Sequence, residues 1–173
     1  MLFRSMACLF YGCEQITTIN LSSFGTSKVT LMTFMFADCI NIKSLDLSKF
    51  NTHSLTKADN MFQNLKLTEI DLSNFNWDNV NSMNEMFISN NKLELVNFGN
   101  SEIKQSVSVT NIFLNCSQRM IIYINKIDPE TLFGTYEKNF TIAQCGQLSK
   151  ESIFSRFNSN KIVCIQNCEN LLN

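Results

Sequence analysis

The chain has 173 residues, of which 45% are hydrophobic and 17% are charged, so it is long enough for one domain with a substantial core. Its 14 basic residues nearly balance its 15 acidic ones, and no block of Lys and Arg appears. This charge pattern argues against binding to nucleic acid or to an anionic lipid surface. No apolar stretch approaches the length of a membrane-spanning helix.

A Met-Phe dipeptide or a close variant of it recurs along the chain. The phenylalanines stand at positions 10, 36, 62, 87 and 113, so the steps between them are 26, 26, 25 and 26 residues. A period this regular indicates one small unit that is repeated in tandem and that relies on its neighbours to bury its apolar side. The sequence therefore predicts a solenoid, an architecture that is typical of binding rather than of catalysis.

Each repeat is expected to contain one short helix. Apolar residues at offsets 0, 3, 6 and 7 end in the Met-Phe dipeptide and would form one stripe on a helix. The three clearest stretches are 29–36, 55–62 and 80–87.

A different rhythm follows each Met-Phe dipeptide. Segments such as Leu45-Asp46-Leu47 alternate apolar and polar residues, which is typical of a strand with one buried face. Further strands are predicted at 96–98 and 122–124, and a last one at 161–165. A helix is also expected near residues 149–157.

Together these elements predict an α/β repeat solenoid that is similar to leucine-rich repeats. Parallel strands would line one face and short helices the other, with about 26 residues per repeat. We assign residues 1–127 to an array of four to five repeats, the first one truncated, and residues 128–173 to an irregular C-terminal capping segment. Because residues 3–13 already match the second half of a repeat, we expect the chain to be part of a longer array.

The repeat resembles a known family in detail. Segments such as Leu45-Asp46-Leu47-Ser48-Lys49-Phe50-Asn51-Thr52 are similar to the BspA-type leucine-rich repeat, also called DUF285, and so is Met35-Phe36-Ala37-Asp38-Cys39, in which Cys stands three residues after the Met-Phe dipeptide. The resemblance covers roughly residues 3–116. It implies a cell-surface or secreted protein with a role in adhesion or protein binding, and it brings no catalytic residues with it.

The seven cysteines do not indicate a metal site or an active site. Cys13 and Cys39 occupy equivalent positions in adjacent repeats, where a disulfide is geometrically possible. Because Leu65 fills the same position in the next repeat, buried free thiols in a mostly apolar slot are the favoured interpretation. A single histidine, His53, makes a zinc site improbable, and we expect no metal and no cofactor.

The outward side of the predicted strands is the candidate binding surface. Its polar residues would stack into ladders on an exposed face, and the candidate site residues are Asn20, Ser44, Asp46, Glu69, Asp71 and Asn97. A structural alternative remains open, in which these side chains cap turns and keep the strand soluble.

The sequence therefore favours a non-enzymatic module that binds a protein or glycan partner at the cell surface or outside the cell. The alternative is an intracellular leucine-rich repeat scaffold. Three Asn-x-Ser/Thr triplets, beginning at Asn20, Asn115 and Asn139, fit the N-glycosylation motif, although a chain rich in Asn and Ser produces such triplets by chance.

Overall fold

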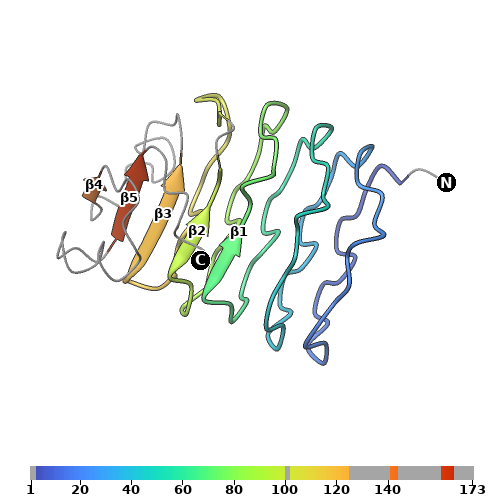
Figure 1. Ribbon diagram of the computed structural model, residues 1–173, viewed down its shortest axis with the longest axis horizontal. Coiled ribbons are helices and arrows are strands. Elements are labelled where there is room, and N and C mark those ends of the chain that lie inside the picture. Colours follow the sequence, from blue (N-terminus) through green and yellow to red (C-terminus); the bar gives the residue numbers. More distant parts are fainter. Residues whose placement is uncertain (1–2, 100–101, 125–140, 144–160, 166–173) are drawn as a thin grey trace.

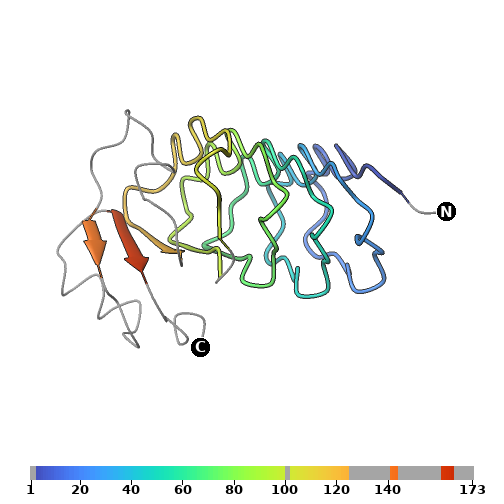
Figure 2. The same cartoon turned by 90° about the horizontal axis from the view of Figure 1, so that it is seen from above.

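The chain winds into a row of coils that follow one another along the long axis of the molecule (Figures 1 and 2). The structure is a computed structural model, and it describes residues 3–99, 102–124, 141–143 and 161–165. Parallel bridges join equivalent residues of successive coils, namely Ser5 to Leu31, Leu31 to Lys57, Lys57 to Ser82, and Ser82 to Ser108. The interval between bridged residues is thus the period of the sequence repeat.

Short strands form one parallel sheet on one side of the coils (Figure 1). They are β1 (Glu69–Asp71), β2 (Leu95–Asn97), β3 (Met120–Ile124), β4 (Thr141–Ala143) and β5 (Lys161–Ile165). Their order in the sheet is β1-β2-β3-β5-β4. The strands predicted near residues 96–98, 122–124 and 161–165 are confirmed. The remaining parts of the predicted capping segment, including the helix expected near 149–157, lie outside the described residues.

The predicted α/β fold is wrong, because the described residues contain no helix. The stretches 29–36, 55–62 and 80–87, which were expected to be helical, consist of bridges and consecutive turns. Strands are also absent from the first coils, around Leu21 and Leu47. Between those two coils the strand sides share a single backbone hydrogen bond, from the amide of Lys43 to the carbonyl of Thr17 (3.0 Å).

We refer to residues 5–13, 31–39, 57–65, 82–90 and 108–116 as the turn segments. Their hydrogen bonds explain why no helix forms. In segment 31–39, alternate amides donate across to the next coil at 3.0 Å, to the carbonyls of Lys57, Asp59, Met61 and Gln63. The amides of Met35, Ala37 and Cys39 donate only three residues back within the same coil, as from Cys39 to Phe36 (3.2 Å). A helix needs every amide for its own turns, and here half of them bind the neighbouring coil.

Backbone geometry fixes the same alternation. Each turn segment has two residues with a positive φ, four positions apart, which no α-helix tolerates in its interior. The first set is Cys8, Phe34, Asn60, Glu85 and Asn111, and the second is Gly12, Asp38, Asn64, Ser89 and Asn115. Asn, Asp and Gly adopt this conformation more readily than other residues, and they hold six of these ten positions.

The repeated phenylalanines form a continuous stack through the middle of the array. Successive ring centroids from Phe10 through Phe36, Phe62 and Phe87 to Phe113 lie 5.3 to 5.9 Å apart, with interplanar angles of at most 15°. Methionines and leucines of the same repeat surround the stack, and most of them are fully buried. The core therefore runs the length of the array and has no single centre.

Buried polar groups at one corner also link successive coils. The hydroxyl of Thr26 donates to the carbonyl of Asn51 (3.1 Å) and accepts from its amide (2.7 Å). Thr52 makes the same pair of bonds with Asn76, at 3.3 and 2.7 Å. In the following coil Trp77 takes this position, and its Nε1 donates to the carbonyl of Phe98 at 3.2 Å. Each buried side chain thus has a partner, as burial requires.

Phe62 should contribute more to stability than Phe10, although both belong to the same stack. Phe62 is fully buried between two rings, whereas Phe10 is half-buried at the end of the stack. We expect Phe62→Ala to lower the free energy of unfolding by about 3–5 kcal/mol, and Phe10→Ala to lower it by clearly less. Chemical denaturation of the two variants measures the difference, and equal losses would contradict the stacked arrangement.

The positive φ of Asn111 (53°) gives a second prediction. A β-branched residue is strained in this conformation, so Asn111→Val should be less stable than Asn111→Gly by about 1–2 kcal/mol. The neighbouring Thr110 is also exposed but does not have a positive φ, and Thr110→Val should change stability by less than about 0.5 kcal/mol. Thermal and chemical denaturation of the three variants test this. A stable Asn111→Val protein would mean that the turn geometry is wrong.

Candidate interaction surface

The outward side of the strands is exposed over three successive coils. Of the six residues that the sequence selected, Asn20, Ser44, Asp46, Glu69 and Asp71 are exposed, and Asn97 is half-buried. Between them, Leu21, Leu47, Ile70 and Leu72 point inward and are buried, as the alternating pattern requires. We call the surface formed by Asn20, Ser44, Asp46, Glu69 and Asp71 the exposed strand face.

Four of the six predicted residues have a structural task. The side-chain Oδ1 of each accepts a hydrogen bond at 2.9 to 3.0 Å from the backbone amide two residues further on, in the pairs Asn20–Ser22, Asp46–Ser48, Asp71–Ser73 and Asn97–Gly99. This is an Asx turn, and it stands at the same place in each of the four coils. The turn-capping alternative therefore holds for these four residues, whereas Ser44 and Glu69 make no such bond.

Two residues after the Asx residue, the first three coils have a serine and the fourth has Gly99. The geometry of the turn explains this difference. Gly99 has a φ of 71°, and a Cβ at this position would lie 2.4 Å from the carbonyl oxygen of Ser73. Any larger residue would clash with the backbone of the neighbouring coil.

Hydrogen bonding stabilises the charged form of Asp46. Bonds from the side chain and the backbone of Ser48 lower the pKa of this carboxyl below its ordinary value, with a smaller contribution from Lys49. The carboxylate is fully exposed, so it is negatively charged and available to solvent at neutral pH.

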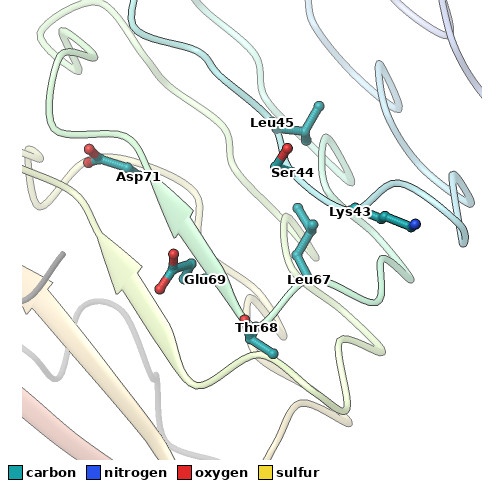
Figure 3. Close-up of a pocket in the computed structure, with 7 residues that line it drawn as sticks. All are labelled: Lys43, Ser44, Leu45, Leu67, Thr68, Glu69 and Asp71. Carbon is teal, nitrogen blue, oxygen red and sulfur yellow. The ribbon is translucent and has the colours of Figure 1, made fainter. Parts of the chain in front are cut away.

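A shallow pocket of about 160 Å³ lies between the second and third exposed coils (Figure 3). Lys43, Ser44 and Leu45 come from one coil, and Leu67, Thr68, Glu69 and Asp71 come from the next. Figure 3 shows Glu69 and Asp71 on the same side of β1, whereas the ammonium group of Lys43 points away from both. The pocket thus offers two carboxylates and two hydroxyl groups beside leucine side chains.

The polar character of the face ends at β2. In the register of the sheet, Glu69 of β1 pairs with Leu95 of β2, and Leu95 pairs with Ile121 of β3. Leu95 and Ile121 are apolar and fully buried. Asp71 is opposite Asn97, which is opposite the largely buried Tyr123. A partner can therefore contact this side of the molecule over the coils that precede β2.

The cysteine position of the repeat is polar rather than merely apolar. Cys39 Sγ donates to the carbonyl of Phe10 at 3.0 Å, and Cys116 Sγ donates to that of Phe87 at 2.9 Å. Asn90, at the same position, donates to the carbonyls of Phe62 and Phe87, both at 2.7 Å. The prediction of a mostly apolar slot was incomplete, since Leu65 alone lacks a side-chain donor.

Cys8, Cys13 and Cys39 are free thiols. Burial raises the pKa of the Cys39 thiol to about 11, which leaves almost no thiolate at neutral pH. No three His, Cys, Asp or Glu side chains of the described chain are grouped so that they could hold a metal ion.

Sequence reasoning missed four residues of the pocket. Leu45 and Leu67 were assigned to the apolar pattern of the strands, and Lys43 and Thr68 were not selected at all. Both directly precede the strand positions that the repeat pattern selected, and the alternation of buried and exposed residues gave no reason to include them. The available signal was their position in the corner that opens each strand, where Lys43 and Thr68 are exposed.

The turn formed by Asp46 can be tested through its pH dependence. Because the folded pKa is lowered, the carboxylate stabilises the fold above its unfolded pKa, and this contribution is lost as the pH falls through the folded pKa. Asp46→Asn keeps the Oδ1 acceptor, as Asn20 and Asn97 do, and should show no such loss. Asp46→Ala lacks the acceptor at every pH.

Denaturation at pH 7 and pH 3 measures these differences. At pH 7 the Asn variant should be more stable than the Ala variant, and the wild-type protein should lose stability relative to the Asn variant on acidification. If the Asn and Ala variants are equally stable at pH 7, the hydrogen bond to Ser48 does not hold the turn.

Comparison with known proteins gives a single match. No curated protein and no solved structure matches the chain. Within the described ranges, no helix is long and apolar enough to cross a membrane. One family model, described as "Mycoplasma protein of unknown function, DUF285", matches residues 4–122. This match covers more than half of the chain and coincides with the stacked coils, so the protein belongs to the DUF285 family.

Proposed function

We propose that this protein is a non-enzymatic interaction module of a cell-surface or secreted protein of the BspA-type leucine-rich repeat class. A protein or glycan partner binds along the exposed strand face, and adhesion is one role that such binding would serve. The observation that carries the proposal is the pocket in Figure 3, which two coils build together on a polar and solvent-accessible surface. Its carboxylates and hydroxyls can bond to the hydroxyls of a sugar or to the polar groups of a polypeptide.

The chemistry of this surface favours binding over catalysis. Asp46 and Asp71 each hold a backbone amide, so their carboxylates are fixed in place by the fold. The raised pKa of Cys39 makes its thiol a poor nucleophile at neutral pH, and its proton is bonded to the carbonyl of Phe10. An array of this kind presents side chains on a rigid support, and variation of those side chains selects the partner.

One observation favours the second candidate function, an intracellular scaffold for protein–protein interaction. Cys8, Cys13 and Cys39 are free thiols, which is the usual state in a reducing compartment. Protease treatment of intact source cells separates the two candidates. A surface protein is digested and an intracellular scaffold is protected until the cells are lysed.

The strand face itself is tested with substitutions at Glu69, which lines the pocket and takes no part in an Asx turn. Glu69→Arg places a long cation over the pocket and should reduce binding to a partner by at least about 10-fold. Suitable probes are an array of extracellular proteins and an array of glycans. Glu69→Gln has the same shape as the wild-type residue and measures the part of the loss that is due to charge.

Glu14→Arg makes the same charge change at an exposed site outside the strand face and serves as the matched control. It should bind as the wild-type protein does. If Glu69→Arg is folded and binds with undiminished affinity, or if Glu14→Arg loses binding equally, the strand face is not the binding surface.

A further inference from the structure

Two of the described asparagines belong to Asn-x-Ser triplets, and the structure places them differently. Asn20 lies on the exposed strand face, and its Oδ1 accepts hydrogen bonds from the amide (3.0 Å) and the hydroxyl (2.7 Å) of Ser22. Asn115 lies in the last described turn segment, residues 108–116, which belongs to none of the strands. It is exposed, and its φ of 58° places it in a tight turn between the buried residues Phe113 and Cys116.

The carboxamide of Asn115 is free, which distinguishes it from most of the asparagines that the structure describes. Eight others donate a hydrogen bond from Nδ2 to a neighbouring group, and none of the eight belongs to an Asn-x-Ser/Thr triplet: Asn41, Asn60, Asn64, Asn74, Asn76, Asn79, Asn84 and Asn90. Several of these bonds join successive coils, so a substituent on Nδ2 would disrupt the array. Among the described residues, Nδ2 of Asn115 has no hydrogen-bond partner.

We propose that Asn115 is an N-glycosylation site, with Asn115-Cys116-Ser117 as its acceptor sequence. The donor is an oligosaccharide carried on a polyprenyl diphosphate. The bond between the sugar C1 and the diphosphate oxygen breaks, a bond from C1 to Nδ2 forms, Nδ2 loses one proton, and the polyprenyl diphosphate leaves. Since Nδ2 makes no bond within the protein and the side chain is exposed, the glycan displaces no contact of the fold.

The position of Asn115 is compatible with partner binding. Asn20 stands in the same column as Asp46 and Asp71, so a glycan on Asn20 would cover the exposed strand face. A glycan on Asn115 projects from the turn side and leaves the pocket between Ser44 and Glu69 open. The inference rests on the exported form of the proposed function, because the transfer takes place in the secretory pathway.

The experiment uses the full chain behind a cleavable secretion signal in a eukaryotic cell line. Asn20→Asp and Asn139→Gln remove the other two acceptor sequences, and Asp keeps the Oδ1 acceptor that Asp46 and Asp71 also provide. Asn139 lies outside the described residues. The secreted protein should carry one N-glycan, seen as a shift in intact mass that peptide:N-glycosidase removes. Ser117→Thr should keep the glycan, whereas Ser117→Ala and Asn115→Gly should lose it.

His53→Ser gives a positive control, because it makes the exposed Asn51 the first residue of an Asn-Thr-Ser triplet. A secreted protein that carries a glycan at Asn51 and none at Asn115 overturns the inference. Partner binding, measured on the protein with Asn20 unchanged and on its Glu69→Arg variant, tests the proposed function separately. Binding without a glycan at Asn115 rejects only the glycosylation site, and a glycan without binding rejects only the strand-face function.

Discussion

Pairing of every second amide with the neighbouring coil is the constraint on which the rest of this structure depends. In segment 31–39, four amides reach across to the next coil at 3.0 Å, and those of Met35, Ala37 and Cys39 close turns within their own coil. Seven of the nine backbone amides of this segment are thus hydrogen-bonded without a helix or a long strand. This arrangement sets the spacing between coils, and that spacing brings the phenylalanine rings into a stack with centroids 5.3 to 5.9 Å apart.

The sequence identified the period, the buried residues and several strands correctly, and it misidentified the Met-Phe segments. Offsets of 0, 3, 6 and 7 describe a helical stripe, but here residues at the same offsets are buried in a segment of consecutive turns. Val29, Met32, Met35 and Phe36 are all buried, so the apolar pattern reported burial and not helicity. The clue to the true conformation was the recurrence of Asp38, Asn64 and Asn115 at one position, where a positive φ is needed.

The candidate site was predictable in part. Alternation along Leu45-Asp46-Leu47 placed Asp46 on the outside correctly, because a residue between two buried neighbours must point away from the core. Asp46 and Asp71 also cap turns, but this role could be recognised only once the structure placed the backbone amide two residues later within hydrogen-bond distance. The burial of Leu95 and Ile121 was likewise beyond the repeat pattern, since it depends on how the array continues after β1 and not on the repeat itself.

Because alternate amides pair with the neighbouring coil, the number of residues in each turn segment is fixed. One residue inserted within residues 57–65 would exchange the amides that face the neighbour with those that face inward, and every bond beyond it would be lost. The single irregularity in the period, the step of 25 from Phe62 to Phe87, avoids this. In one repeat, two residues separate Cys39 from Ile42. In the next repeat, only Lys66 separates the equivalent residues Leu65 and Leu67, so the missing residue falls in the corner after the turn segment. Corners can therefore absorb changes in length that the turn segments cannot.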